Sequence, residues 1–240
     1  MKKYFAVLIS LAFATNLMAL PAFKDYPSGS KRHAAFFAYL KPLVKQANAD
    51  ILMQRHRLLA LYRKQFHLKQ KLTTEQKKWL EQLFLKYRIN FENTPKQWNF
   101  LINRVDVIPA SLALAQAANE TAYGITRFAQ NANNFYGVWC HTPGCGLVPH
   151  QREKDKTHEI KKYPSVAASI ADYMLILNTR KSYNLFRELR AQERSLKQYP
   201  SGMVLASGLL NYSQRREIYV EAIQKIIIKN QLEKTINYNL

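Results

Sequence analysis

Glu120 is the residue best placed in the sequence to do chemistry. It follows the segment ASLALAQAA, residues 110–118, which is apolar on almost every side and starts after Pro109, as a buried helix would. Gly124 offers a C-terminal stop for that helix. At the end of a buried helix, desolvation and the helix dipole both raise the pKa of a carboxyl. Such a group can protonate a leaving oxygen as a general acid. The structural alternative is a surface residue that caps the helix.

Aromatic and amide side chains follow Glu120 closely. Aromatic rings can stack on sugar rings and amides can bond to their hydroxyls, although aromatic residues in such a run also commonly form core. The candidate substrate-binding residues are Tyr123, Asn134, Phe135, Tyr136, Gly137 and Trp139. The sequence alone leaves both interpretations open.

The two cysteines of the chain, Cys140 and Cys145, are separated by four residues that include the turn-forming pair Pro143-Gly144. In an oxidising compartment a local disulfide is the simplest outcome, and it would stiffen this segment. The alternative is a zinc ion held by both cysteines and two of three nearby histidines, which are His141, His150 and His158. Because the spacing lacks a standard zinc-finger pattern, we expect no metal and no cofactor.

The first nineteen residues resemble a secretory signal peptide. They combine a basic start, the apolar run YFAVLISLAFA, and a small-residue cleavage site ending at Ala19. The run is broken at Thr15-Asn16 and is short for a bilayer span, which favours a cleaved leader over an anchor. We therefore expect export to the periplasm or cell envelope.

Composition narrows the function classes further. A hydrophobic content of 48% argues against disorder, and two cysteines and seven glycines argue against a disulfide scaffold, a large β-sandwich or a propeller. The charge of +20 is spread along the chain, without a compact basic patch carrying base-reading aromatics. Outside the cytoplasm such a charge favours contact with an anionic envelope surface. We expect no nucleic-acid partner and a monomer.

The sequence predicts helices both before and after the segment that contains Glu120. Apolar residues at spacings of three, four and seven predict a helix over residues 31–66, which Pro42 kinks or restarts. A second helix is expected to open at Thr73 or Thr74 with a capping box through Gln76. Two further helices are expected at residues 165–178 and after a cap at Ser213.

Several ordered motifs together resemble a known family. The string LALAQAANETAYGITRFAQNANNFYGVW is similar to the active-site region of the Bax-like and flagellar-type glucosaminidases, family seventy-three of the glycoside hydrolases. The similarity continues through CHTPGCGLVPHQR and LLNYSQRREIYVEAIQKII, over residues 96–240, and residues 31–90 resemble the helical region of the Bax-like group. We therefore divide the chain into a leader (1–19), a helical N-terminal region (20–95) and a catalytic domain (96–240).

The resemblance implies a mainly α, α+β lysozyme-like fold with a small β-lobe from about Phe135 to Tyr163 beside the cleft. It implies hydrolysis of the β-1,4 bond after N-acetylglucosamine in peptidoglycan, with Glu120 as the catalytic acid. Tyr212 matches the tyrosine of the closing motif of the family, and residues 134–137 match its substrate-lining stretch. The chain has NETAYG where LESGWG is usual and YSQR where YATD is usual.

The second catalytic group is less constrained by the sequence. Retaining enzymes place two carboxyls about 5–5.5 Å apart, and inverting ones about 6.5–9.5 Å apart. Of the lobe carboxylates we favour Glu159 over Glu153 and Asp155, because it leads into an extended segment. Alternatively, the 2-acetamido group of the substrate attacks, and Tyr212 orients it. Tyr219 is a second tyrosine that an alignment could confuse with Tyr212.

Two rival functions remain open. A muramidase or lytic transglycosylase also uses a solitary glutamate at a buried helix end. A non-catalytic envelope-binding protein would keep the cleft and lose turnover through the changes around Glu120 and Tyr212.

Overall fold

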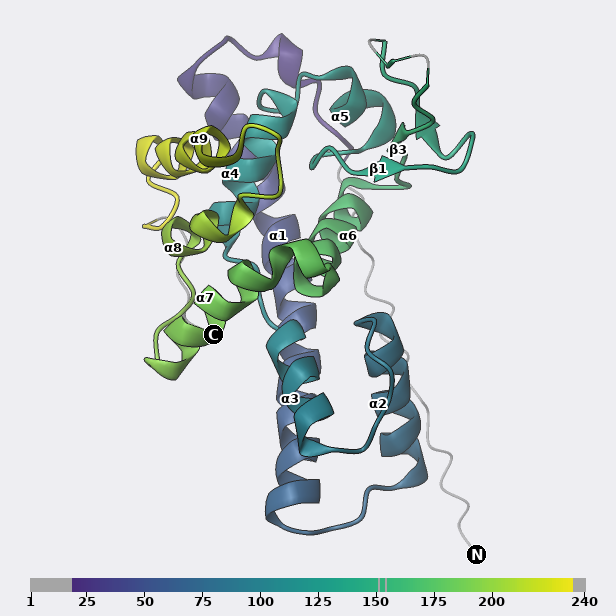
Figure 1. The fold of residues 1–240 in the computed structure, drawn as a ribbon. Helices are drawn as coiled ribbons and strands as arrows, with labels where there is room; N and C mark the ends of the chain where they lie inside the picture. Colours follow the sequence, from purple (N-terminus) through teal and green to yellow (C-terminus); the bar gives the residue numbers. More distant parts are fainter. Residues whose placement is uncertain (1–18, 151, 154, 235–240) are drawn as a thin grey trace, which may run out of the picture.

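The computed structural model describes residues 19–150, 152–153 and 155–234. Nearly all of the expected leader, residues 1–18, lies outside the described residues. Within the described ranges, no helix combines the length and apolar character that crossing a bilayer requires. The architecture is mainly α with one small sheet, which confirms the expected lysozyme-like α+β class (Figure 1).

A long helix, α1 (Ser30–Tyr62), runs through both the upper and the lower part of the molecule (Figure 1). It continues directly into a π-helical turn, η2 (Arg63–His67). The helix contains Pro42 without ending there, so the predicted alternative of a restart is wrong. The apolar stripe expected on this helix is buried or half-buried throughout. The sequence pattern therefore identified the packed face of α1 correctly.

Two shorter helices, α2 (Thr74–Lys86) and α3 (Pro95–Arg104), flank the second half of α1 and form an arm with it (Figure 1). The predicted capping box is confirmed. Thr73 Oγ1 accepts a hydrogen bond from the Gln76 backbone N–H at 3.3 Å, and Gln76 Oε1 accepts one from the Thr73 N–H at 3.0 Å. Trp98 of α3 is fully buried against aromatic rings of α1 and α2, which gives the arm its own packed centre.

Helix α4 (Ala110–Thr121) lies at the centre of the upper part and carries Glu120 in its last turn. Every residue from 110 to 118 is buried, as the apolar sequence predicted. The first half of α1 packs against it, and so do α8 (Gly202–Ala206) and α9 (Arg216–Lys229). Because α1 and α4 share one hydrophobic cluster, the N-terminal helix supports the helix of the candidate acid directly.

The chain leaves α4 in a left-handed turn. Ala122 and Tyr123 have φ angles of 46° and 59°, so the helix ends before the stop that was expected at Gly124. Gly124 has a φ of 85°, and a Cβ there would lie 2.2 Å from the ring of Phe23. Phe23 belongs to a short 3-10 helix, η1 (Phe23–Asp25). Glycine is therefore needed at 124 so that this N-terminal segment can cover the turn.

A small β-lobe follows α5 (Arg127–Ala132). Its strands are β1 (Trp139–Cys140), β2 (Gly146–Leu147) and β3 (Glu159–Lys161). They form an antiparallel sheet in the order β1-β3-β2, with Trp139 opposite Ile160 and Leu147 also opposite Ile160. The lobe expected between about Phe135 and Tyr163 is confirmed.

The rest of the chain returns to the helical core. Helix α6 (Val166–Thr179) is capped by Ser165 and packs on α1, close to the bounds predicted for it. The final helix, α9, begins at Arg216, so the expected cap at Ser213 lies too early. The segments between α6 and α8 are η3 (Lys181–Tyr183) and α7 (Asn184–Ser195), and η4 (Ser207–Leu209) follows α8.

A buried charge cluster joins α1, the segment before α4, and α7. Asp106 is only 3% exposed and pairs with Arg194 at 2.8 Å and with Arg55 at 3.5 Å. Arg190, equally buried, donates hydrogen bonds to the backbone oxygens of Asp106 and Val107. Burial alone would raise the pKa of Asp106, but the surrounding guanidinium groups lower it. The carboxylate is therefore the counter-ion on which three buried or half-buried arginines depend.

Candidate active site

The carboxyl group of Glu120 has two oxygens in different surroundings. Oε1 accepts a hydrogen bond from the Tyr219 hydroxyl at 2.9 Å and a longer one from the Asn119 side-chain amide at 3.4 Å. Oε2 faces Gly137, where a Cβ would lie 3.1 Å from it. One side of the carboxyl is thus held by the protein, and the other faces a position without a side chain.

The environment raises the pKa of Glu120. Burial is the main cause, and the hydrogen bonds from Tyr219 and Asn119 oppose it by stabilising the ionised form. Burial, together with the nearby Glu120 charge, also raises the pKa of Tyr219, so this hydroxyl keeps its proton and remains a donor. The direction of this shift is the one expected for a carboxyl at the end of a buried helix, with burial as its cause.

A chain of hydrogen bonds fixes the direction in which Tyr219 donates. The Tyr173 hydroxyl donates to Gln116 Oε1 at 2.6 Å, and Gln116 Nε2 donates to the Tyr219 hydroxyl at 3.0 Å. The proton of Tyr219 is then directed at Glu120 Oε1. The proton of the neutral Glu120 belongs on Oε2, because Oε1 already accepts. The acid proton therefore faces Gly137.

The loop that brings Gly137 to Glu120 is held by Asn134. The Asn134 side-chain amide donates to the Val138 oxygen at 2.9 Å and to the Lys161 oxygen at 2.8 Å. Its Oδ1 accepts from the backbone N–H groups of Tyr136 and Val138. Gly137 itself has a φ of 62°, which favours glycine, and its residue surface is exposed. Asn134, expected to contact substrate, uses its polar atoms within the protein.

Two further residues from the expected substrate-binding set are in the core. Phe135 is 0% exposed and stacks on Phe36 of α1, and Tyr136 is 1% exposed and stacks on Tyr173 at 3.7 Å between ring centroids. Their side chains present no surface to a ligand. They anchor the loop that carries Gly137.

The two C-terminal tyrosines have different partners. The hydroxyl of Tyr219, on α9, contacts Glu120, whereas the hydroxyl of Tyr212 donates to the backbone oxygen of Tyr136 at 2.8 Å. Their rings stack with centroids 5.3 Å apart. Tyr212, which the resemblance matches to the catalytic motif, thus supports the Gly137 loop. The sequence indicated two candidate tyrosines, and only long-range packing distinguishes their roles.

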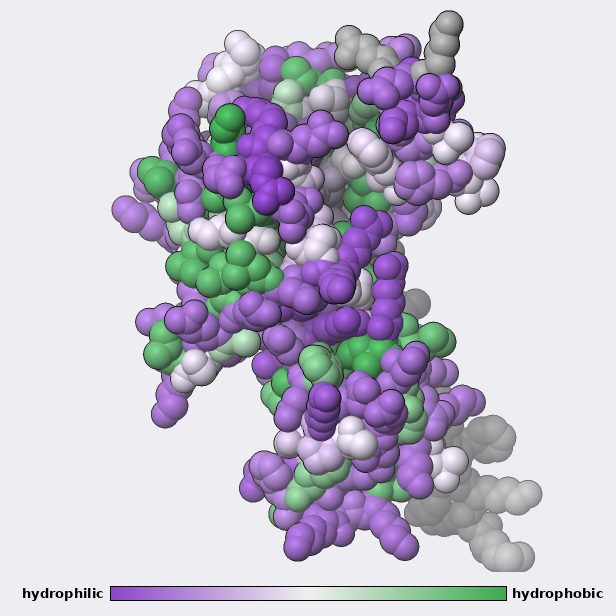
Figure 2. Space-filling view, in the orientation of Figure 1, coloured by the Kyte–Doolittle hydropathy of each residue, from purple (hydrophilic) through white to green (hydrophobic). Residues whose placement is uncertain are grey.

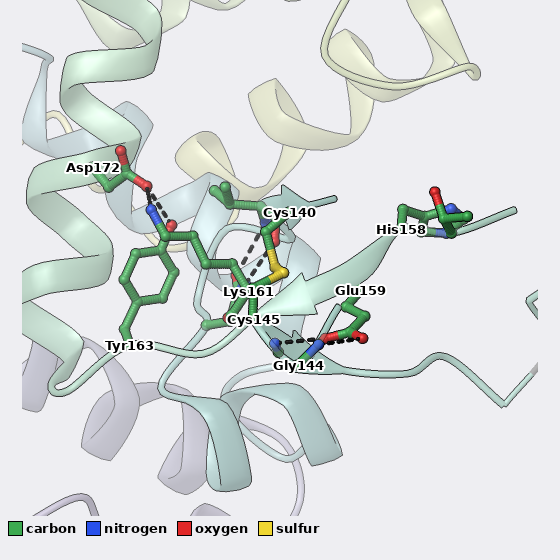
Figure 3. The surroundings of a disulfide bond; sticks show 12 residues. Cys140, Gly144, Cys145, His158, Glu159, Lys161, Tyr163 and Asp172 are labelled. Carbon is green, nitrogen blue, oxygen red and sulfur yellow. Dashed lines mark hydrogen bonds and ion pairs between the residues drawn. A yellow bond between two sulfur atoms is a disulfide. The ribbon is translucent and has the colours of Figure 1, made fainter. Parts of the chain in front are cut away.

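Glu159 is engaged inside the β-lobe. Its two oxygens accept hydrogen bonds from the backbone N–H groups of Gly144 at 3.0 Å and Gly146 at 2.8 Å, and these bonds lower its pKa (Figure 3). The residue is 7% exposed. The structure therefore engages the favoured second carboxylate in holding the segment between Cys140 and β2 against β3. Glu153 and Asp155 are exposed.

A disulfide joins Cys140 at the end of β1 to Cys145 before β2 (Figure 3). The two sulfurs lie near the carboxylate of Glu159, but they are bonded to each other and offer no thiolate to a metal. His158, one of the potential zinc ligands, instead stacks on Trp139 with ring centroids 4.0 Å apart. The geometry thus favours a disulfide-stiffened lobe.

The orientation of the lobe is fixed by Asp172 of α6. This carboxylate accepts a hydrogen bond from Lys161 Nζ at 2.6 Å and one from the Tyr163 hydroxyl at 2.7 Å (Figure 3). Burial would raise the pKa of Asp172, but these contacts lower it. A charge-assisted contact of this kind connects the strand that carries Glu159 to the helical core.

Among the expected substrate-binding residues, two aromatic side chains keep exposed surface. Trp139 is 52% exposed on the lobe. Tyr123 is half-buried and stacks on His33 at 3.5 Å between ring centroids. The space-filling view shows the surface hollowed between the lobe and the side of the molecule that carries α4 and α9 (Figure 2). Sequence reasoning missed the roles of Gln116 and Tyr173 near the acid, because apolar periodicity marks such residues only as core.

Comparison with known proteins agrees with this geometry. Residues 95–232 match the model of the glucosaminidase family, described as mannosyl-glycoprotein endo-beta-N-acetylglucosaminidase. The chain belongs to this family. It is also 30% identical over 203 residues to the protein named bax of Escherichia coli strain K12, covering 84% of this chain and 70% of that protein. No solved structure matches. The family supports a glycoside hydrolase activity, and the partially buried Glu120 is located within the matched region.

Proposed function

We propose that this protein is an endo-β-N-acetylglucosaminidase that cleaves the β-1,4 bond after N-acetylglucosamine in peptidoglycan, with Glu120 as the general acid. The observation that carries the proposal is the asymmetric carboxyl of Glu120. Its pKa is raised by burial, Oε1 is held by Tyr219, and Oε2 faces the unobstructed position of Gly137. A glycosidic oxygen approaching beside Gly137 would receive the proton from Oε2.

The engagement of Glu159 supports a substrate-assisted route. Both of its oxygens accept backbone hydrogen bonds that an attacking carboxylate would have to release. In the proposed route the 2-acetamido oxygen forms a bond to the anomeric carbon while the glycosidic C–O bond breaks and its oxygen takes the proton of Glu120. Ionised Glu120 then removes a proton from the water that opens the resulting ring. Tyr219 stabilises the ionised state between the two steps by donating to Oε1.

The place of action follows from the sequence. An apolar leader over residues 1–19 and a charge of +20 both suit a protein exported to an anionic cell envelope. Trp139, exposed on the lobe, would offer a stacking surface to the glycan strand. We propose that the protein works there as a monomer and without a cofactor.

The decisive experiment is the digestion of purified peptidoglycan with wild type and Glu120→Gln, followed by mass spectrometry of the new chain ends. Reducing N-acetylglucosamine ends from wild type alone support the proposal. Reducing or anhydro muramic acid ends would instead indicate a muramidase or lytic transglycosylase. Absence of release by wild type would indicate a binding protein.

A second experiment distinguishes the two routes. If Glu159 were the nucleophile, Glu159→Ala would lose turnover and added azide would restore it by taking the place of the carboxylate. In the substrate-assisted route azide restores nothing, because Glu159→Ala removes only the hydrogen bonds that hold the segment of Gly144 and Gly146 in the lobe. A circular dichroism melt of the same variant reports whether the lobe change spreads to the helical core.

A further inference from the structure

A second hollow lies beside Asn119, the residue that precedes Glu120 in α4. It has a volume of about 410 Å³ and lies between the start of α1, the end of α4 and the second half of α9. Its polar lining consists of His33, Asn119, Tyr123, Lys225 and Lys229. The sequence analysis and the proposed mechanism use only Tyr123 among these residues.

The hollow is continuous with the surroundings of the acid. Asn119 lines it and also donates to Glu120 Oε1 at 3.4 Å. Along α9, the rise of 1.5 Å per residue places Lys225 about 9 Å and Lys229 about 15 Å beyond Tyr219, which holds the same oxygen. The part of α9 that carries both lysines lines the hollow together with Asn119, so the lysines lie within about 15 Å of Tyr219 along the helix axis.

The hollow is strongly cationic. Lys225 and Lys229 line it with His33, and burial together with the charges of Lys229 and Arg32 lowers the pKa of His33. The opposing carboxylate near the rim is Glu221, which pairs with Lys225 at 3.3 Å while both side chains are more than 60% exposed. Among the ion pairs of the described residues, Lys229 has no carboxylate partner.

The walls suit a small, flat anionic group. His33 and Tyr123 stack nearly parallel, with ring centroids 3.5 Å apart and planes 9° apart, and they form one firm side. Ile226 adds an apolar side chain to the lining beside the two lysines. Ammonium groups with an amide nearby and an apolar surface beside them are the features that recognise a carboxylate on a short aliphatic stem.

We propose that this hollow binds a carboxylate of the peptide stems that branch from the glycan strand, so that the enzyme prefers strands carrying peptides. The inference rests on the proposed function, because it takes the strand to lie across Glu120. Lys225 and Lys229 attract the carboxylate, and the His33–Tyr123 stack packs against the aliphatic part of the stem.

The test measures binding and turnover separately, using peptidoglycan freed of other wall polymers and the same material stripped of peptides by an amidase. Binding is measured by co-sedimentation in the full-length Glu120→Gln background, which prevents digestion. Lys225→Gln with Lys229→Gln should weaken binding to peptide-bearing material about tenfold and leave binding to stripped strands unchanged. The charge-matched control is Lys77→Gln with Lys78→Gln, two exposed lysines on α2.

Equal binding by the double variant and its background would overturn the inference. A loss of the same size on stripped strands, or in the α2 control, would also overturn it, because the lysines would then act only through net charge. Turnover by otherwise wild-type protein is scored on both materials. Lysine-dependent binding without any turnover would contradict the proposed function and leave the peptide site standing, whereas turnover with lysine-independent binding would remove the peptide site alone.

Discussion

Replacing Tyr219 with phenylalanine removes one hydroxyl from the candidate site and keeps the ring that stacks on Tyr212. The lost contacts are the 2.9 Å hydrogen bond to Glu120 Oε1 and the 3.0 Å hydrogen bond that the hydroxyl accepts from Gln116 Nε2. The first of these acts on the carboxyl. The hydrogen bond from Tyr219 stabilises the ionised carboxyl and opposes the effect of burial. Its removal should therefore raise the pKa of Glu120 further. The general acid would keep its proton to higher pH.

The size of the effect follows from the strength of the bond. A hydrogen bond to a charged group contributes about 1.5–3 kcal/mol, and 1.4 kcal/mol corresponds to about a tenfold change in an equilibrium. The alkaline limb of the profile of kcat/KM against pH should then move upward by about one to two pH units. The assay is the release of reducing ends from peptidoglycan between pH 4 and 9. In the same variant kcat falls, because the ionised state between the two chemical steps loses a donor.

The matched control is Tyr212→Phe. Its hydroxyl donates to the Tyr136 oxygen and not to Glu120, so the variant should lower stability without moving the alkaline limb. An unmoved limb in Tyr219→Phe, or an equal movement in Tyr212→Phe, would refute the reasoning. The second result would assign to Tyr212 the catalytic role suggested by the closing motif.

Three further predictions concern the acid and its support. Gly137→Ala should reduce kcat/KM, because the new Cβ would lie 3.1 Å from Glu120 Oε2. It should also lower the free energy of unfolding by about 1 kcal/mol, because alanine is strained in a left-handed backbone position. Gly144→Ala is the control for this backbone cost in the same assays, because Gly144 has a φ of 80° and no neighbour within 4 Å. Glu120→Gln should be more stable than wild type at pH 8 in urea titrations, and the difference in unfolding free energy should narrow toward pH 4. The pKa of Glu120 is higher in the folded than in the unfolded protein, so wild type loses stability as pH rises from the unfolded-state pKa through the folded-state pKa. Asp106→Asn should lose about 3–5 kcal/mol at pH 7, measured by the same titrations, because its arginines lose their buried counter-ion. Because the pKa of Asp106 is lowered in the folded protein, wild type keeps the stabilisation from this carboxylate above about pH 4 and loses it as pH falls through the folded-state pKa. A difference in unfolding free energy between the variant and wild type that stays constant down to pH 3 would contradict the account.

Local patterns in the sequence predicted the elements whose formation depends on nearby residues. The apolar run before Glu120 identified a buried helix, and Thr73 with Gln76 identified a capping box, because both features depend on residues within a turn or two. The same reasoning placed the start of the last helix too early, at Ser213, which accepts a local hydrogen bond from Arg215 without capping the helix.

Roles that depend on distant partners could not be read from local patterns. Tyr219 is 99 residues from Glu120 in the sequence, and Tyr212 is 76 residues from the backbone oxygen it holds. Both tyrosines occur in one amphipathic stretch, so periodicity does not indicate which hydroxyl reaches the acid. Asn134 likewise matched a substrate-lining motif, but its amide is used by the loop and by β3. The partners of these three side chains are visible only in the folded structure.

The central claim is that Glu120 holds its proton in the folded protein at a pH where an ordinary glutamate has lost it. Carbon-13 NMR of protein with labelled glutamate side chains measures this directly, with the Glu120 signal identified by its absence in Glu120→Gln. The account predicts that this carboxyl titrates above the usual range for glutamate and in step with the alkaline limb of activity. A carboxyl that titrates at or below the usual range, or activity that persists after it has ionised, would contradict the account.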